Sequence, residues 1–359
     1  MKLNLFILFV SFALVSNPGP GHAASVDEAI QRISNLPAAQ RRAALEQGAR
    51  REGQIVFYTS VSAADVPKIT AAFEASHPYV KVIPYRAQPS SLFTRLETEA
   101  RAGRELADLV GSAPAQMWLL KQRKLSRPYL SPERQAFPSG SYDREGFWAG
   151  FEVTPIVLAF NPRMVAAAET PRSYDDLLKP NWKGRMSLGN DEYEWFSVMM
   201  DSWGKKKGSD YMKALAKQNL NMVGTSSRMR VELMLAGEFA ASLAARGRRV
   251  VEFKEQGAPI DYRLFDPYPS VPNFIALMAR APHPHASILF FDWLLSQEGQ
   301  SALSQIPRLT IRKGMKQKGR LQDLYEKEFV FVDPASLGAH LTELVEEYDQ
   351  IFNARAEKQ

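Results

Sequence analysis

Short apolar runs alternate with stretches of helical periodicity along this chain, and residues 53–85 show the pattern most clearly. Ile55 to Tyr58 is a run of β-branched and aromatic residues, which is typical of a buried strand. Ser62 is placed to cap a helix over the following residues, and residues 80–85 form a second apolar run. The stretch therefore predicts a strand, a helix and a parallel strand. Its first turn lies at the carboxyl end of a strand, where open α/β sheets bind ligands.

The alternation continues along the chain, with two interruptions. A long extended segment at 147–160 contains Pro155, and a Pro-rich segment at 266–272 leads into an extended return at 273–277. Because proline removes a backbone donor from a sheet, we expect each segment to leave one sheet and enter another. Further strands are predicted at 107–110, 185–188, 221–223 and 237–244, with helical patterns between them.

This order predicts an α/β protein of two lobes, each built on a doubly wound, mainly parallel sheet, with two hinge crossings between them. We expect residues 24–153 together with 274–359 to form the first lobe and residues 154–273 to form the second. The last helix is predicted over 337–352 from apolar residues at helical spacing, and on this assignment it belongs to the first lobe.

Residues 1–23 have the features of a secretory signal peptide. Lys2 precedes an apolar run at 3–15, a Pro-Gly-Pro breaker follows, and small residues precede a cut after Ala23. The run is too short to span a membrane, and no later apolar run approaches that length. We therefore expect an exported protein whose leader is removed near Ala23.

Composition narrows the possible chemistry. The 359 residues are 45% hydrophobic and 23% charged, which is a globular composition with room for two domains. The sequence has no cysteine, so disulfides, thiol catalysis and cysteine metal sites are excluded. The net charge of +6 comes from dispersed basic residues, which we interpret as solvated surface, so we expect no nucleic-acid partner.

Three predicted strand-to-helix turns carry hydroxyl groups: Thr59-Ser60, Gly111-Ser112 and Thr225-Ser226-Ser227. A single turn of this kind is more often only a helix cap. Several of them in two matching lobes favour a cleft in which helix N-termini face one another and bind a polar or anionic ligand.

Two charged turns have both a structural and a functional interpretation. The turn from Asp191 to Trp195 either stabilises a helix N-terminus or recognises a cation with its acidic and aromatic side chains. The segment Arg246 to Arg249 is either exposed surface, which we favour, or an anion clamp. His283-Pro284-His285 is interpreted as a turn rather than a metal site, and no nucleophile, zinc or nucleotide motif occurs.

Five segments in this order resemble the periplasmic solute-binding proteins of ABC importers, in the type II group that includes ferric-iron, polyamine, thiamine and phosphonate binders. The segments are Ala49 to Ser60, Ala107 to Val110, Ile156 to Pro162, Asp176 to Arg185 and Phe291 to Gln300. The resemblance implies the type II periplasmic-binding fold, a periplasmic location, a small-molecule solute and a permease partner in the inner membrane. It implies no enzymatic activity and no cofactor, and we expect a monomer.

We expect the ligand to be a small polar or anionic solute, captured when the lobes close about Thr154-Pro155 and Val271-Pro272. The candidate ligand-binding residues are Thr59, Ser60, Ser112, Thr154, Glu192, Tyr193, Thr225, Ser227 and Arg246. The resemblance also offers ferric iron as an alternative. Ferric-iron members use a pair of adjacent tyrosines after the strand predicted at 237–244, and this chain has Ala245-Arg246 there. We therefore expect no metal ligands.

Two further alternatives remain open. An exported α/β hydrolase would need a nucleophile–base pair, for which His77 and His340 are the obvious bases, although neither lies in a predicted ligand turn. A sensor that presents its solute to a receptor would have the same sequence features as an importer component.

Overall fold

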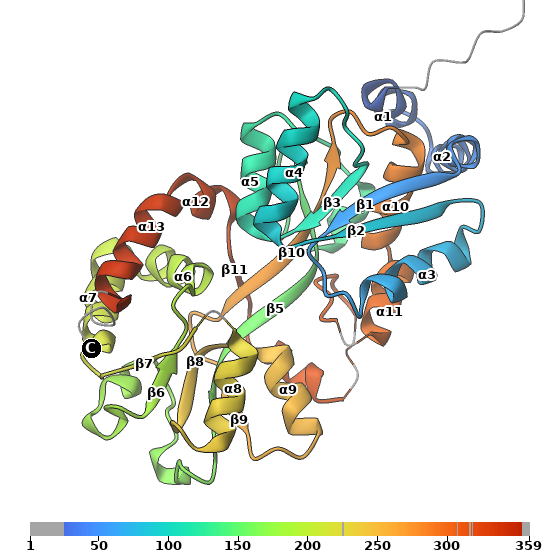
Figure 1. Ribbon diagram of the computed structural model, residues 1–359. Helices are drawn as coiled ribbons and strands as arrows, with labels where there is room; N and C mark the ends of the chain where they lie inside the picture. Colours follow the sequence, from blue (N-terminus) through green and yellow to red (C-terminus); the bar gives the residue numbers. More distant parts are fainter. Residues whose placement is uncertain (1–24, 225, 307, 316, 318, 354–359) are drawn as a thin grey trace, which may run out of the picture.

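The computed structural model describes residues 25–224, 226–306, 308–315, 317 and 319–353, and it consists of paired strands flanked by helices (Figure 1). The strands follow the order β2-β1-β3-β10-β5-β8-β6-β7. We call the β2-β1-β3 end with its helices the first lobe and the β8-β6-β7 end with its helices the second lobe. The long strands β5 and β10 run between the two.

The first lobe contains the predicted strand–helix–strand unit. Gly53 ends α2 in the left-handed conformation with φ 68°, and its N–H donates to the carbonyl of Ala49. The elements up to the first crossing are α1 (Val26–Ser34), α2 (Ala38–Glu52), β1 (Gln54–Thr59), α3 (Val66–Ser76), β2 (Lys81–Arg86), α4 (Pro89–Arg101), β3 (Leu109–Ser112), α5 (Pro114–Gln122), β4 (Ser126–Arg127) and β5 (Ala149–Phe160).

The second lobe follows, and the chain then returns. The second-lobe elements are β6 (Met186–Leu188), α6 (Tyr193–Trp203), α7 (Lys205–Ala216), β7 (Asn221–Met222), α8 (Ser227–Ala236), β8 (Ala241–Arg246), α9 (Gly247–Glu255) and β9 (Asp261–Arg263). The return consists of β10 (Pro269–Met278), α10 (Pro284–Leu295), α11 (Gln297–Gln305), β11 (Val330–Phe331), α12 (Pro334–Ala339) and α13 (Leu341–Tyr348).

The strand directions confirm the predicted fold class. Strand β1 is parallel to β2 and β3, and β6 is parallel to β7 and β8. The crossing strands β5 and β10 are antiparallel to each other, with Thr154 opposite Val271 and Pro155 opposite Ser270. The residues chosen from sequence as the two crossings therefore lie side by side.

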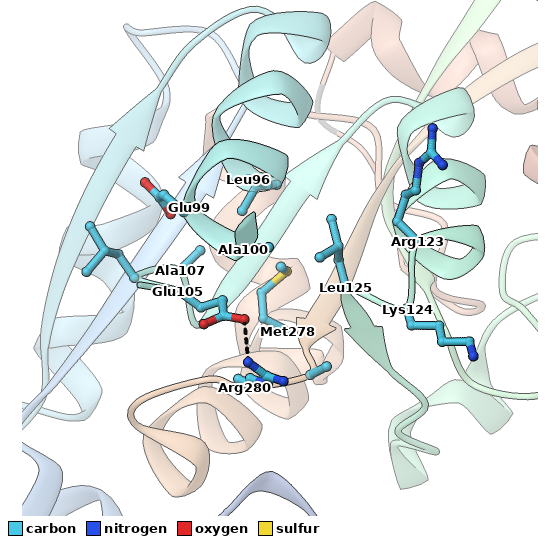
Figure 2. A pocket seen from close by; sticks show the side chains of 12 residues that line it. Leu96, Glu99, Ala100, Glu105, Ala107, Arg123, Lys124, Leu125, Met278 and Arg280 are labelled. Atoms are coloured by element: carbon cyan, nitrogen blue, oxygen red, sulfur yellow. Dashed lines mark hydrogen bonds and ion pairs between the residues drawn. The ribbon is translucent and has the colours of Figure 1, made fainter. Parts of the chain in front are cut away.

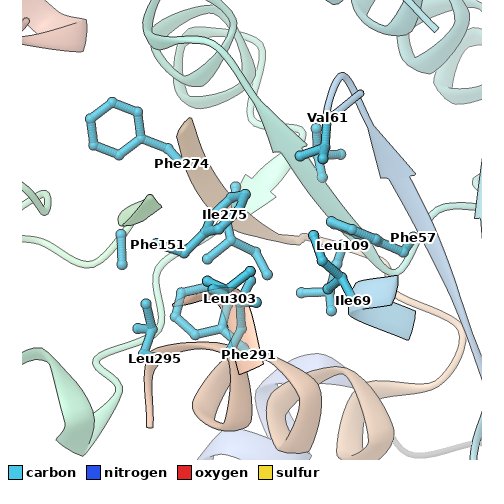
Figure 3. Packing of buried hydrophobic residues seen from close by; sticks show 14 of the residues in the cluster. Phe57, Val61, Ile69, Leu109, Phe151, Phe274, Ile275, Phe291, Leu295 and Leu303 are labelled. Carbon is cyan, nitrogen blue, oxygen red and sulfur yellow. The ribbon is translucent and has the colours of Figure 1, made fainter. Parts of the chain in front are cut away.

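The first lobe has an apolar core between its sheet and the returning helices. Figure 3 shows Phe57, Leu109 and Ile275 of neighbouring strands close to Ile69 of α3, Phe291 of α10 and Leu303 of α11. The same buried cluster continues into the second lobe through Val157 of β5, Val231 of α8 and Val250 of α9. A separate cluster fills the other face of the second lobe, between its strands and helices α6 and α7.

The C-terminal helices join the two lobes, which corrects the assignment of residues 274–359 to the first lobe alone. Helix α12 packs on α5 so closely that a Cβ on Gly338 would lie 2.3 Å from Cδ1 of Trp118. Helix α13 instead packs on the second lobe, where the Tyr348 ring lies edge-on to Phe196 at 5.4 Å. The hydroxyl of Tyr348 donates to the carbonyl of Gly189. Helical spacing predicted a single helix over 337–352, whereas the structure has α12 and α13 with His340 between them. The contacts of α13 are distant in sequence, so spacing did not indicate the lobe that it joins.

The N-terminal region begins with two helices, α1 and α2. Ser25 and Glu28 form a capping box at the start of α1, and Pro37 precedes the first residue of α2. The expected signal peptide, residues 1–23, lies outside the described residues. Among the helices that the structure does describe, none has the length and apolar character needed to cross a membrane.

The start of α10 is bound to buried carboxylates of the first lobe, and this contact predicts a pH dependence. Asp108 accepts hydrogen bonds from the backbone N–H groups of Val56 and His283, and it lies 2.8 Å from Nδ1 of His283. The Asp108 hydrogen bond raises the pKa of His283 above its usual value, against the effect of burial.

Because the folded-state pKa of His283 lies above the unfolded value of about 6.5, its contribution to stability is complete below that value and lost as pH rises through the folded pKa. Replacing His283 by glutamine is therefore expected to lower the free energy of unfolding more at pH 5.5 than at pH 8.5. Urea titration of both proteins at the two pH values measures this difference. A loss that is equal at both values, or larger at pH 8.5, would contradict it.

Candidate functional site

A hollow of about 460 Å³ lies between the two lobes. Its first-lobe wall consists of Ser60 after β1 and of residues at the starts of α4 and α5, whereas its second-lobe wall consists of residues at the starts of α6, α8 and α9. Residues of β5 and β10 line the space where the chain crosses. The lining residues are Ser60, Gln88, Pro89, Ala113, Thr154, Glu194, Ser227, Arg228, Arg246, Arg248, Arg249, Val271 and Asn273.

Helix α6 begins at this hollow without a side-chain cap, but Glu192 and Glu194 place negative charge at its start. Three further helices that begin here also have no side chain capping their first turn. Their N-cap residues are Gln88 for α4, Ala113 for α5 and Arg246 for α9, and none accepts a hydrogen bond from the first-turn N–H groups. In α8, by contrast, the Ser226 hydroxyl accepts from the N–H of Met229. First-turn N–H groups and the helix dipole both favour a negative charge, so the three uncapped ends add positive potential to both walls.

Four arginines line the second-lobe wall, and three of them are bound to carboxylates. Arg228 pairs with Glu232 at 2.8 Å and Arg249 with Glu252 at 2.5 Å. Arg246 lies 2.9 Å from Glu194 and 3.5 Å from Glu192. Burial alone would lower the pKa of Arg246, but Glu192 and Glu194 outweigh it and raise the pKa.

Arg248 differs from the other three arginines. Its side chain is half-buried in the first turn of α9, and it forms no hydrogen bond or ion pair with any residue that the structure describes. Burial, together with the nearby cation of Arg308, lowers the pKa of Arg248. Arg308 is itself bound to Asp65 and Glu152 of the first lobe, and these two carboxylates, which exceed its single positive charge, also act on Arg248 from a distance and oppose the lowering of its pKa. Arg248 is thus a cation at the hollow that has no direct ion pair among the described residues.

A buried ion pair supports the second-lobe wall from behind. Arg230 of α8 is fully buried and donates to Glu192, the residue that precedes α6. Gly189 is required here, because a Cβ at this position would lie 2.4 Å from Nη1 of Arg230. The pair connects the starts of α6 and α8, and Glu192 also lies close to Arg246.

Four of the nine residues expected from sequence line the hollow: Ser60, Thr154, Ser227 and Arg246. Thr225 lies outside the described residues. The other four are placed behind the wall or beside it. Thr59 is buried and its hydroxyl accepts from the N–H of Val61, and Ser112 is fully buried. Glu192 is buried against Arg230, and the ring of Tyr193 lies edge-on to Tyr348 at 5.3 Å.

These four residues do not line the hollow, and the position of each has a physical reason. Thr59 and Ser112 end strands, and their side chains are enclosed by the packed sheet. Glu192 balances a buried cation, and Tyr193 covers the C-terminal helix. The lining residues that were not among those expected from the sequence include Gln88, Asn273, Arg248 and Arg249. Two sequence features could have indicated three of them. Gln88 precedes a proline at the start of α4, and Arg248 and Arg249 belong to the Arg246–Arg249 segment, for which we favour exposed surface from the sequence.

The hollow offers few ligands for a metal ion. Its lining contains one carboxylate, Glu194, and that group is already bound to Arg246. The lining includes no tyrosine, histidine or aspartate among the residues that the structure describes. Across those same residues, no group of three or more His, Cys, Asp or Glu side chains is arranged to hold a metal ion.

Two other hollows are built from the first lobe alone and include none of the candidate residues. The smaller, of about 270 Å³, is shown in Figure 2, where Leu96, Leu125 and Met278 line it beside the ion pair of Arg280 and Glu105. The larger, of about 1150 Å³, lies beneath α1 and α2 and is lined by Arg41, Tyr129 and Asp292, which are bound to one another. Neither draws on both lobes.

Comparison with known proteins adds a family and a fold. Residues 68–328 match the family model described as bacterial extracellular solute-binding protein. The Fe(3+)-binding periplasmic protein of Serratia marcescens is 24% identical over 235 residues, which cover 62% of this chain and 68% of that protein.

Solved structures show the same architecture. FutA of Trichodesmium, in complex with iron and citrate, has a TM-score of 0.74 and 16% identity, covering 83% of this chain and 99% of that one. The periplasmic binding protein AfuA of Actinobacillus pleuropneumoniae, with exogenous fructose-6-phosphate bound, has a TM-score of 0.69 and 19% identity, covering 84% of this chain and 99% of that one. At these identities the likeness shows the fold alone.

Proposed function

Because this chain belongs to the bacterial extracellular solute-binding protein family, we propose that it is the periplasmic receptor of an ABC importer and captures a small anionic solute between its lobes. Members of this family bind small solutes and work with an ABC permease, and they are transport proteins rather than enzymes. The leader expected at residues 1–23 agrees with delivery of the protein to the periplasm, where we expect a monomer.

The observation that carries the proposal is the charge of the interlobe hollow. Four arginines and the uncapped starts of α4, α5 and α9 surround it, and although three of the arginines are paired with carboxylates, Arg248 has no direct ion pair among the described residues. A volume of about 460 Å³ falls within the range of about 300–1,000 Å³ that is usual for small-molecule sites. Positive potential from both walls favours an anion, and an anion that contacts both walls would draw the lobes together.

The position of the hollow between the lobes also indicates how the lobes would close on a solute. The lobes are joined at Thr154 and Val271, which lie opposite each other on the antiparallel strands β5 and β10. A solute bound to both walls stabilises the closed state by its additional contacts there. The continuous core on the α8–α9 side and the C-terminal helices also connect the lobes, so we expect a limited rotation rather than a wide opening.

A thermal-shift screen tests the ligand class. Inorganic phosphate, phosphorylated sugars, phosphonates, dicarboxylates, polyamines and ferric citrate would each be added at the same excess. A ligand at about 100 times its Kd adds about 2.7 kcal/mol of stability, so a genuine solute produces a clear rise in the unfolding temperature. We expect the largest rise with an anion. A rise only with polyamines would contradict the proposal, whereas a rise with ferric citrate and with none of the iron-free anions would favour a ferric chelate as the solute.

A ferric chelate is the second candidate, favoured by the similarity to the Fe(3+)-binding protein of Serratia marcescens. The hollow has one carboxylate and no tyrosine among the described lining residues, so iron would have to arrive with an anionic chelator that supplies most of its ligands. The hydrolase alternative has no support at this site. His77 is buried and stacked on Phe73, and His340 follows α12, so neither is near the hollow.

A further inference from the structure

The two walls of the hollow differ in chemistry. All four arginines belong to the second lobe, in the first turns of α8 and α9 or just before them. The first-lobe wall and the crossing strands contribute Ser60, Gln88, Thr154 and Asn273, which are neutral. A ligand that fits this hollow therefore meets charge on one side and uncharged hydrogen-bonding groups on the other.

The neutral wall has unused hydrogen-bonding capacity. The side chains of Ser60, Gln88 and Thr154 form no hydrogen bond with other residues that the structure describes. The amide nitrogen of Asn273 donates to Glu152, which leaves its carbonyl oxygen as an acceptor. Hydroxyl and amide groups of this kind recognise hydroxyl groups, because each can donate or accept as the partner requires.

The charged wall has one cation available for a ligand. Arg228, Arg246 and Arg249 are bound to Glu232, Glu194 and Glu252. Arg248 has no such partner, and its position in the uncapped first turn of α9 adds N–H donors beside its guanidinium. A planar guanidinium beside free backbone N–H groups suits an anion with several oxygens, such as a phosphoryl group.

From this asymmetry we propose that the solute is a phosphorylated polyol or sugar. Its phosphoryl group binds Arg248 and the start of α9, and its neutral hydroxylated body lies against Ser60, Gln88, Thr154 and Asn273. The volume of the hollow, about 460 Å³, equals that of roughly fifteen water molecules in the liquid. A bare inorganic anion would therefore leave much of it unfilled. This inference rests on the proposed function and specifies its ligand class.

Calorimetric titration of the mature protein tests both halves of the ligand. The probes are glucose 6-phosphate, glycerol 3-phosphate, glucose, inorganic phosphate and succinate. At least one phosphorylated polyol is expected to bind more than tenfold tighter than inorganic phosphate and than glucose. Inorganic phosphate binding as tightly as both phosphorylated polyols, or succinate binding tightest, would overturn the inference while leaving an anion receptor. A polyamine is titrated as a further probe, and its binding when none of these anions binds would overturn the proposed function itself.

Arginine variants test the assignment of the charged wall. Replacing Arg248 by glutamine is expected to weaken binding of the phosphorylated polyol by about tenfold to a hundredfold, which is the usual loss for a charged hydrogen bond. It should also reduce the dependence of affinity on salt. Arg101→Gln is the control outside the hollow, and because Arg101 is exposed and paired with Glu97 on α4 we expect less than a threefold change. Equal losses in the two variants would contradict the role of Arg248.

The double variant Ser60→Ala, Gln88→Ala tests the neutral wall independently of any charge. It is expected to weaken binding of the phosphorylated polyol and to leave the affinity for inorganic phosphate unchanged. An equal loss for both probes, or no loss for either, would contradict the placement of the hydroxylated body. All of these variants replace half-buried or exposed residues, so we expect each to remain folded. Measuring the unfolding temperature of each variant checks this.

Discussion

Replacing Arg230 by methionine is expected to lower the free energy of unfolding by about 3–5 kcal/mol. Arg230 is fully buried in α8 and pairs with Glu192, whose side chain is 3% exposed. Removing the guanidinium leaves the Glu192 carboxylate buried, with Arg246 at 3.5 Å as a partial substitute. The cost of an unpaired buried charge exceeds what the more apolar methionine side chain recovers, so the net effect is a large destabilisation.

Urea titration measures the free energy of unfolding of each variant. Two comparison variants then separate the effect of the lost charge from the effect of lost packing. Arg228→Met changes an exposed pair on the same helix and is expected to alter stability by less than about 1 kcal/mol. The double variant Arg230→Met, Glu192→Gln removes both charges and should recover part of the loss. A double variant as unstable as Arg230→Met alone would show that lost packing, rather than an unpaired carboxylate, causes the effect.

Replacing Arg308 by methionine is expected to cost a similar amount, about 3–5 kcal/mol. Its guanidinium binds Asp65 at the start of α3 and Glu152 of β5, and all three side chains are at least nine-tenths buried. Burial alone would raise the pKa of Asp65, but the Ser62 hydrogen bond and the Arg308 cation outweigh it and lower the pKa. Arg308 therefore stabilises the junction between the first lobe and the crossing strand through ionised carboxylates.

The pH dependence of this loss gives an internal control. A lowered folded-state pKa contributes stability that is present above the unfolded value of about 3.9 and lost as pH falls through the folded value. The difference in unfolding free energy between the wild type and Arg308→Met should therefore be larger at pH 7.5 than at pH 4. If urea titration gave the same difference at both pH values, the loss would not arise from ionised carboxylates.

Much of the fold follows from local patterns. The run from Ile55 to Tyr58 and the extended segment interrupted at Pro155 were predicted from local pattern, and the structure contains β1 and β5 there. The docking of α13 on the second lobe does not follow from such patterns. It depends on Tyr348 reaching Gly189, residues 159 positions apart, and an amphipathic helix carries no information about which apolar surface will cover it.

Only some of the residues that line the hollow could be named from the sequence, because the others depend on where strands end and on contacts between distant segments. Ser60, a hydroxyl residue after a strand, lines the hollow, whereas Thr59 one position earlier is buried. A shift of one residue reverses the facing of a strand side chain, and sequence alone does not fix where the strand ends. Arg248 and Arg249 resemble solvated surface in sequence, and only the convergence of α9 with α4 and α5 makes them part of a binding wall.

Small-angle X-ray scattering of the mature protein, with and without a saturating phosphorylated polyol that raises its unfolding temperature, tests capture between the lobes most directly. Closure around an anion predicts a smaller radius of gyration when the ligand is bound. For Arg248→Gln at the same ligand concentration we expect no change in the radius of gyration, because the weaker binding leaves this variant mostly without ligand. An unchanged radius in the wild type, with binding confirmed by calorimetry on the same sample, would contradict capture by closure of the two lobes.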